Sequence, residues 1–308
     1  MKTLSLVIPI YNEEENIPEL YRRIKAAVDK DFSQFNYEII LVDDGSSDNS
    51  LRLLEELNQK DKNVVVITFS RNFGHHIAIT AGLDHASGDY VVIMDGDLQD
   101  QPEEILKLYN KLQEGYEVVY GERLNKKFGL KKRFLSFLFN WMIKKLIHEK
   151  IIINSTIFRI MTSEVVASIR QLRERNRYIV GLIGWVGYKQ TVQFVEHGKR
   201  FKGKTKYNMS KQFLLAFNAI FSFSEYFLQL IIKIGLGFVG LSILVIGYVL
   251  IRKFVYHSPI PGWSSLIISL FMVGGIQIIL MGVIGQYIGR IYVEAKNRPL
   301  YVIKKVVR

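Results

Sequence analysis

The chain has 308 residues, of which 49% are hydrophobic and 23% are charged, and its formal net charge is +12. It contains no cysteine, which excludes disulfide bonds and thiolate ligands, so any metal must be held by carboxylate, histidine or water. A basic chain suits nucleic acid, anionic lipid or nucleotide phosphates as partners. Because the basic clusters precede long apolar segments, we expect a lipid surface and no nucleic acid.

Short β-branched or aromatic runs alternate with helical patterns over the first 120 residues. In chain order, the predicted strands are Leu4–Ile10, Tyr37–Val42, Val64–Thr68, Tyr90–Met94 and Glu117–Tyr120, and the predicted helices are Asn16–Val28, Ser50–Leu57, Ile77–His85 and Glu103–Gln113. This alternation predicts an α/β fold, with a mostly parallel sheet and helices on both faces. Ligands of such folds bind beyond the carboxyl ends of the strands.

Two amphipathic helices are predicted at Lys131–Ile147 and Ser210–Phe227, either packed on a core or lying in a membrane interface. Two uncharged runs follow, Ile234–Ile251 and Gly262–Gly289, and each is near or above the roughly 20 residues needed to cross a bilayer. A buried core helix is the alternative for each run. We expect a transmembrane hairpin, and the excess of Arg and Lys after the second run predicts that both ends lie in the cytoplasm.

Asp95-Gly96-Asp97 directly follows the predicted strand Tyr90–Met94. Two carboxylates separated by one small residue can face one Mg²⁺ or Mn²⁺ ion, which prefers oxygen ligands and can bridge to phosphate oxygens. Surface turns also use aspartate freely. The position at a strand end favours the metal site.

Two further polar segments also follow predicted strands. Asp43 and Asp44, within Val42–Asp48, can accept hydrogen bonds from a base and a ribose. An Asp-rich turn that caps the next helix is the alternative, and both interpretations can hold together. Ile8–Glu13 ends the first strand, where an ordinary strand-to-helix turn is the alternative.

In this order the three segments resemble glycosyltransferase family 2. Pro9–Glu13 matches its P-x-Y-N-E element, Val42–Ser46 its V-D-D-G-S element and Asp95–Asp97 its Asp-x-Asp element. Ser70–Gly74 and Asp95–Pro102 are similar to the branch that makes polyprenyl-phosphate sugars, which includes dolichol-phosphate mannose synthase and GtrB-like enzymes. The resemblance covers nearly the whole chain. It implies a Rossmann-like GT-A catalytic domain at 1–205, an amphipathic juxtamembrane region at 206–230, and two transmembrane helices with a basic cytoplasmic tail at 231–308.

The resemblance also implies the site residues. A divalent cation, Mg²⁺ or Mn²⁺, is expected on Asp95 and Asp97. Arginine suits phosphate recognition, although for each basic residue alone a solvated surface charge is the commoner explanation. The expected catalytic residues are Asp95, Asp97, Arg123 and Arg159, and the expected substrate-binding residues are Pro9, Tyr11, Asn12, Glu13, Asp43, Asp44, Arg71, Gln99, Arg175, Arg177, Arg200 and Lys206.

The activity that the resemblance implies is inverting transfer of one sugar to undecaprenyl phosphate, at the cytoplasmic membrane of a bacterium. UDP-glucose is the first choice of donor, and GDP-mannose, UDP-GlcNAc and UDP-galactose remain open. In many relatives the element at Asn154–Arg159 reads Gly-Asp-Phe-Arg, but here Ile157 takes the acidic position, so no general base can be carried over. A phosphate acceptor does not need a general base, because its second pKa is about 6 and it is largely ionised at neutral pH.

Two rival functions are weighed against this one. A processive polysaccharide synthase usually has more membrane spans and a Gln-x-x-Arg-Trp motif, whereas the comparable stretch here is Glu174–Tyr178. The rival of another class is a nonenzymatic membrane protein that binds nucleotide or lipid. Glycines in both apolar runs permit close helix packing, and relatives form tetramers, so a homo-oligomer is expected.

Overall fold

The computed structural model describes residues 1–123, 157–175, 177–198 and 262–308, together with scattered positions between 233 and 255. The chain divides into two compact units, one made of Met1–Ile220 with Pro299–Arg308 and the other of Phe221–Arg298. The expected amphipathic helices Lys131–Ile147 and Ser210–Phe227 lie outside the described residues, as does part of the expected span Ile234–Ile251.

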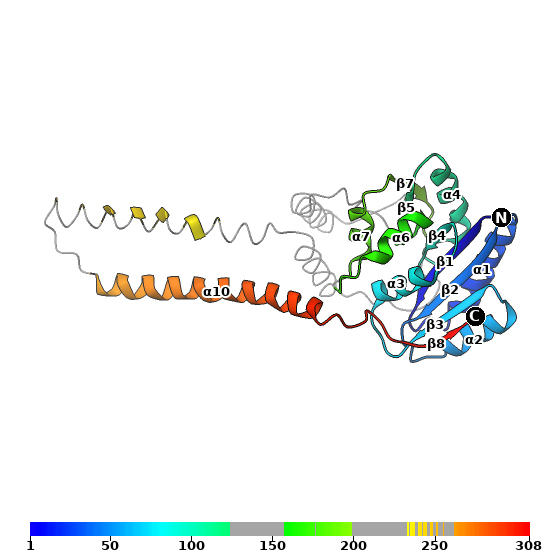
Figure 1. The fold of residues 1–308 in the computed structure, drawn as a ribbon, viewed down its shortest axis with the longest axis horizontal. Helices are drawn as coiled ribbons and strands as arrows, with labels where there is room; N and C mark the ends of the chain where they lie inside the picture. Colours follow the sequence, from blue (N-terminus) through cyan, green and yellow to red (C-terminus); the bar gives the residue numbers. More distant parts are fainter. Residues whose placement is uncertain are drawn as a thin grey trace. The chain divides into compact units, whose positions relative to one another are not determined.

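The described residues of the first unit form an eight-stranded sheet. Its strands are β1 (Thr3–Ile10), β2 (Asn36–Asp43), β3 (Val64–Phe69), β4 (Tyr90–Ile93), β5 (Val118–Arg123), β6 (Arg159–Thr162), β7 (Gln190–Val195) and β8 (Ile303–Val307). Their order across the sheet is β7-β5-β6-β4-β1-β2-β3-β8 (Figure 1). β1 runs parallel to β2 and β4, β2 to β3, and β5 to β7, whereas β6 and β8 are antiparallel to their neighbours. The predicted α/β class with a mostly parallel sheet is therefore confirmed, and β1 to β5 overlap the five predicted strands.

Helices cover both faces of this sheet. α1 (Ile17–Asp31), α2 (Ser50–Lys60) and α4 (Ile105–Gln113), the last preceded by a 3-10 turn at Pro102–Glu104, bury their apolar residues on one face. α3 (His75–His85), α6 (Ser163–Gln171) and α7 (Ile179–Trp185) bury theirs on the other. β1 serves both cores, since successive side chains of a strand point to opposite faces: Leu6 and Ile8 pack with α1, and Val7 packs with α3.

α3 lies unusually close to the sheet because it carries Gly82. A Cβ at this position would lie 2.2 Å from Val7 Cγ1, so a larger residue would push the helix away from β1. Close packing of this kind is a common reason for a glycine within a helix, despite its unfavourable helix propensity. The position of α3 matters because its first residue faces the loop after β4, as described below.

The end of the chain returns to the first unit. The sequence predicts only a basic cytoplasmic tail after the second apolar run, whereas Ile303–Val307 forms β8, antiparallel to β3 at the edge of the sheet. Lys304 and Lys305 are exposed, and Lys305 Nζ donates to Glu55 Oε1 at 2.7 Å. Lysines protect an edge strand from pairing with other chains. The same two lysines interrupt the apolar pattern by which the strand would have been predicted.

α10 (Trp263–Ala295) overlaps the expected span Gly262–Gly289. Its part Met272–Ala295 is long and apolar enough to cross a membrane, as judged by length and composition alone. Large apolar side chains along it are exposed, among them Leu270, Ile278 and Met281. A continuous exposed apolar surface is typical of a helix that meets lipid or another protein.

Candidate active site

The carboxyl ends of β1, β2, β3 and β4 share one edge of the sheet, because these strands are parallel neighbours. Polar loops follow them at residues 11–16, 44–49, 70–74 and 94–101. These loops contain the segments that the sequence analysis singled out. The fold therefore brings residues from four separate parts of the chain to the edge where α/β proteins bind ligands.

The loop after β4 holds Asp95 and Asp97 in different surroundings. The Asp95 side chain is 36% exposed. Asp97 is buried, and its carboxylate accepts hydrogen bonds from the Gln99 backbone N–H at 3.1 Å and from Gln99 Nε2 at 2.8 Å. Glycine is needed between the two aspartates, since a Cβ at Gly96 would lie 2.7 Å from Ile10 Cδ1. The spacing of the motif thus reflects close packing on β1.

The end of β7 crosses this same loop. Gly198 N donates to Gln99 O at 2.9 Å, and His197 forms an isolated antiparallel bridge with Asp100. Leu98, between the aspartates and this bridge, has a φ of 61°, which is uncommon for a residue with a side chain. Strained backbone of this kind is found at ligand-binding loops whose surroundings hold them in place.

Asp95 and Asp97 can supply part of the coordination shell of a divalent cation. Within the described ranges, no three His, Asp, Glu or Cys side chains converge into a complete protein cage. Mg²⁺ is commonly held by one or two carboxylates, with water and substrate phosphates as its other ligands. The donor set therefore suits a cation that arrives with, or is completed by, a diphosphate.

Two histidines at the start of α3 were missed in the sequence analysis. His75 Nε2 lies 3.4 Å from Asp95 Oδ1. Burial lowers the pKa of His75 to about 4, against the opposing effect of nearby carboxylates, so at neutral pH this contact joins an uncharged ring to a carboxylate. His76 packs edge-on against Tyr178, with ring centroids 5.7 Å apart. Both histidines directly follow the motif Ser70–Gly74, and their place next to this motif was the one feature of the sequence that could have marked them as site residues.

The loops after β1 and β2 hold each other in place. Asn12, with a left-handed φ of 52°, accepts a hydrogen bond at Oδ1 from Ser47 N at 2.8 Å. Its own backbone N–H donates to Ser46 Oγ at 3.0 Å. Asn12 and the two serines thus join the first and second predicted motifs into one surface.

Pro9, Tyr11 and Glu13 have different positions within that surface. Pro9 is buried in β1 opposite Val42. The Glu13 carboxylate accepts a hydrogen bond from Asn16 Nδ2. Tyr11 is 38% exposed, so part of its ring is accessible for stacking on a base. Of these three predicted residues, Tyr11 is the most exposed, and Glu13 is partly buried.

Asp43 and Asp44 are both buried and hydrogen-bonded. Asp43 Oδ1 accepts from Ser46 N at 3.1 Å. The Asp44 carboxylate accepts from Phe73 N at 2.7 Å and from Gly74 N at 3.0 Å, which fixes the loop after β3. Burial raises the pKa of both carboxyls, that of Asp44 to about 6. Carboxylate oxygens accept more than one hydrogen bond, so these contacts leave acceptor capacity for a donor nucleoside.

Arg71 lies at the rim of the site. Its side chain is exposed, and its guanidinium stacks over the Phe73 ring at 4.1 Å from the centroid. Its backbone touches the loop after β2 at Gly45, whose φ is 69° and where a Cβ would lie 2.6 Å from the Arg71 carbonyl carbon. Arg71 is thus well placed for the substrate contact expected of it.

The position of Arg159 does not fit the catalytic contact expected from the sequence. It is 0% exposed, and its Nε donates to Ile157 O at 2.8 Å. Its guanidinium lies 4.8 Å from the centroid of the Tyr120 ring, and burial lowers its pKa. Arg159 is thus enclosed by protein, and its buried positive charge interacts with the carboxylates of Asp100 and Asp95.

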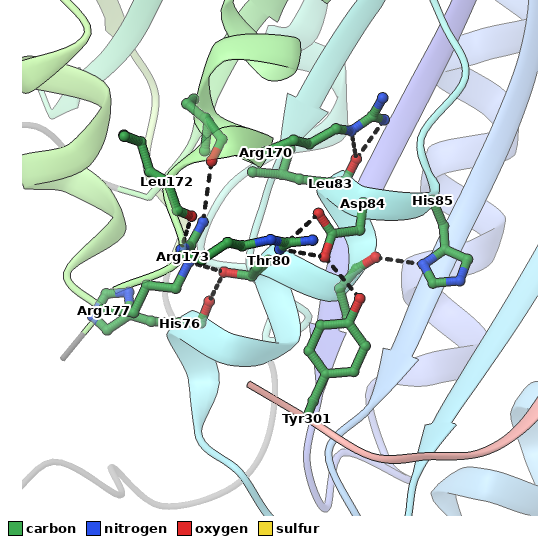
Figure 2. A network of polar contacts seen from close by, with 12 residues as sticks. His76, Thr80, Leu83, Asp84, His85, Arg170, Leu172, Arg173, Arg177 and Tyr301 are labelled. Atoms are coloured by element: carbon green, nitrogen blue, oxygen red, sulfur yellow. Dashed lines mark hydrogen bonds and ion pairs between the residues drawn. The ribbon is translucent and has the colours of Figure 1, made fainter. Parts of the chain in front are cut away.

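Arg177 also points inward, which argues against its expected contact with phosphate. Figure 2 shows its guanidinium directed at Thr80 of α3 and at the end of α6. Nε donates to Thr80 Oγ1 at 2.7 Å, one terminal nitrogen donates to Leu172 O and the other to Ile169 O at 3.3 Å. A guanidinium has five N–H donors in a fixed plane. These bonds to α3 and α6 make Arg177 a structural clamp between two helices.

The remaining predicted arginines and lysine have distinct positions. Arg123 ends β5, which runs in the same direction as β4, so it reaches the same edge as Asp95. Arg123 Nε is buried and has no hydrogen-bond partner among the described residues. Arg175 is half-buried between α6 and α7. Arg200 and Lys206 lie outside the described ranges.

Comparison with known proteins agrees with this arrangement. Residues 5–170 match the family model described as Glycosyl transferase family 2. The chain is 42% identical over 302 residues to the uncharacterized glycosyltransferase YkcC of Bacillus subtilis, covering 98% of this chain and 93% of YkcC. It is 40% identical over 303 residues to the SfII prophage-derived bactoprenol glucosyl transferase of Shigella flexneri, covering 98% and 97%. Among solved structures it is similar to glucosyl-3-phosphoglycerate synthase of Mycobacterium tuberculosis in complex with Mn²⁺ and UDP, with 17% identity, a TM-score of 0.46 and coverage of 70% and 76%.

Proposed function

The chain belongs to glycosyltransferase family 2, and on that premise we propose that it transfers one hexose from a nucleotide sugar to polyprenyl phosphate with inversion at the anomeric carbon. UDP-glucose is the proposed donor and undecaprenyl phosphate the proposed acceptor. The observation that carries this proposal is the pair Asp95 and Asp97 at the carboxyl edge of the sheet, on the same edge as Arg123, whose buried Nε has no hydrogen-bond partner within the part of the chain that the structure describes. Likeness over nearly the full length to bactoprenol glucosyl transferases supports the choice of sugar and lipid.

In the proposed reaction, an acceptor phosphate oxygen forms a bond to the anomeric carbon. The bond from that carbon to the donor diphosphate oxygen breaks, and its electron pair leaves with the nucleoside diphosphate. Negative charge therefore grows on the diphosphate, and donors held in place before the reaction stabilise it best. Arg123 is positioned to donate to this charge, and a divalent cation on Asp95 and Asp97 would supply further neutralisation.

No protein base is needed in this scheme. Ile157 stands where related sequences carry an acid, and it packs against the apolar core on the α3 side. A phosphate monoester has a second pKa of about 6, so at neutral pH the acceptor is already mostly a dianion. The absence of a carboxylate at this position therefore favours a phosphate acceptor over a sugar hydroxyl.

We propose that the enzyme works at the cytoplasmic face of a bacterial membrane. The support is α10, an apolar helix of 33 residues with exposed apolar side chains, which carries Arg290 near its end and is followed by Lys296 and Arg298. In this proposal residues 1–205 are the catalytic domain, which β8 (Ile303–Val307) completes, 206–230 lie in the interface, and 231–298 supply two spans. Glycines such as Gly274 and Gly275 permit close helix packing in a homo-oligomer, with a tetramer as one form.

Transfer of radiolabelled sugar to undecaprenyl phosphate in detergent micelles tests the proposal. The full-length protein is assayed with UDP-glucose, UDP-GlcNAc, UDP-galactose and GDP-mannose, each with Mg²⁺, Mn²⁺ or EDTA. The expected result is a labelled lipid with UDP-glucose that requires the cation and is lost in Asp97→Asn. Asp89→Asn is the matched control, because Asp89 accepts a hydrogen bond from Thr3 N at the opposite edge of the sheet.

Other outcomes have definite meanings. A labelled lipid only with GDP-mannose would replace the proposed donor while keeping the reaction class. Release of free sugar without a lipid product would overturn the proposed acceptor. No turnover of any nucleotide sugar, with nucleotide still bound, would favour a nonenzymatic binding protein.

A further inference from the structure

His197 lies between two residues that each contact one aspartate of the proposed metal site. Its Nε2 is 3.0 Å from Gln99 Oε1, and its Nδ1 is 3.6 Å from Asp100 Oδ1. Gln99 Nε2 in turn donates to Asp97 Oδ2 at 2.8 Å. Asp100 Oδ2 accepts from the Asp95 backbone N–H at 3.4 Å. The imidazole is thus linked to both aspartates, through one intermediate residue on each side.

The direction of these hydrogen bonds defines what His197 supplies. Gln99 presents its NH₂ group to Asp97, so its amide oxygen must face His197. An amide oxygen only accepts, which makes His197 Nε2 the donor. Without that donor, the Gln99 amide loses the partner that fixes which of its two ends faces Asp97. A flipped amide would place an oxygen against the carboxylate, so the Asp97 side chain would have to turn.

The backbone around His197 is fixed independently of its ring. Gly198 N donates to Gln99 O at 2.9 Å, and Glu196 N donates to Glu104 Oε2 at 3.2 Å. The imidazole is only 15% exposed. A change of the ring therefore alters the hydrogen-bond chain while the main-chain contacts on both sides of it stay in place.

We propose that His197 is a positioning residue that, through Gln99, holds the Asp97 carboxylate in the orientation that binds the cation and donor diphosphate. This inference rests on the proposed function. Removal of a group that orients a metal ligand lowers the affinity for the metal by roughly 10- to 100-fold.

The test measures how tightly the full-length protein binds Mn²⁺ in the presence of UDP. The concentration of free Mn²⁺ is monitored by its electron paramagnetic resonance signal. His197→Phe keeps a ring but removes the donor, and we expect its Mn²⁺ dissociation constant to rise about 10-fold or more. His197→Gln restores an N–H donor and is expected to recover most of the affinity. His85→Phe is the control, because the His85 ring forms a hydrogen bond within its own helix, with Ala81 O at 2.8 Å.

A double-mutant cycle with Gln99→Leu keeps the inference testable even if one variant folds poorly. If His197 acts through Gln99, the double variant binds Mn²⁺ as weakly as the weaker single variant. Additive losses, or His197→Phe with wild-type affinity, would overturn the proposal and leave the proposed function standing. Failure of the wild-type protein itself to bind Mn²⁺ with UDP would instead overturn the metal site, and the role of His197 with it.

Discussion

The Tyr301 hydroxyl donates a hydrogen bond of 2.7 Å to Asp84 Oδ2, and the two residues are 217 positions apart in the sequence. Arg173 binds the same carboxylate at 2.8 Å (Figure 2). The Tyr301 ring also stacks on Phe69, with centroids 5.2 Å apart. Asp84 lies on α3, whose first residue, His75, faces Asp95. The segment after α10 therefore helps to fix the helix that contacts the candidate metal site.

Tyr301→Phe removes one hydroxyl from this contact while keeping the stacked ring. Loss of a hydrogen bond to a charged group typically costs about 1.5–3 kcal/mol, although Arg173 continues to compensate the Asp84 charge. We expect thermal unfolding of the detergent-solubilised protein to shift down by about 2–6 °C, at roughly 2–4 °C per kcal/mol. The kcat of transfer should stay close to that of the wild type. An unchanged unfolding temperature would show that the hydroxyl contributes nothing to stability.

Gly96→Ala tests whether the spacing of the two aspartates depends on packing against β1. The added methyl group would meet Ile10 Cδ1 at 2.7 Å, and Ile10 is fully buried. Overpacking of this kind costs about 1–3 kcal/mol, so kcat/KM should fall about 10-fold or more as the loop shifts. Adding Ile10→Val removes the clashing methyl group and should recover part of the loss. A double variant no better than Gly96→Ala would contradict this explanation.

The raised pKa of Asp44 predicts how the free energy of unfolding depends on pH. Burial raises its pKa from 3.8 to about 6, so between these values the native state holds a proton that the unfolded state has released. Stability contributed by this group is then present below about pH 4, falls as the pH rises to 6, and is constant above. We expect Asp44→Asn to lack this decrease, which amounts to about 3 kcal/mol at most. Unfolding of both proteins across pH 4–7 measures the difference, and parallel curves would contradict the shifted pKa.

Arg123→Gln tests the contact proposed with the diphosphate. Hydrogen bonds to charged groups contribute about 1.5–3 kcal/mol, so kcat/KM should fall roughly 10- to 100-fold while the fold is kept. Arg52→Gln is a suitable control, because Arg52 pairs with Glu56 at 3.0 Å on an exposed face of α2. Equal activity of the two variants would remove Arg123 from the site.

The α/β class and the position of Asp95 could be predicted because both depend on local pattern. An apolar run such as Tyr90–Ile93 is recognisable as a buried strand, and a polar residue after it must lie at the edge of the sheet. The direction of a long basic side chain is not a local property. Arg159 was expected to be catalytic and Arg177 to bind substrate, and both point inward because buried carbonyls and a threonine hydroxyl accept their hydrogen bonds.

Residues that meet only in space were also missed. His197 carries no motif of its own, and its place in the site follows from β7 crossing the loop that contains Gln99. His75 was missed although it follows a recognised motif, because nothing in the sequence brings α3 within reach of Asp95. That approach depends on Gly82 packing against Val7, which is a contact between distant segments.

The pairing of β8 with β3 also sets an order of events during synthesis. The ribosome makes residues 221–298 before Ile303–Val307, so the nascent chain must carry its apolar helix while β3 still has an unpaired edge. An exposed edge strand can pair with the wrong partner. The sheet can therefore be completed by β8 only after the whole apolar segment has been synthesised.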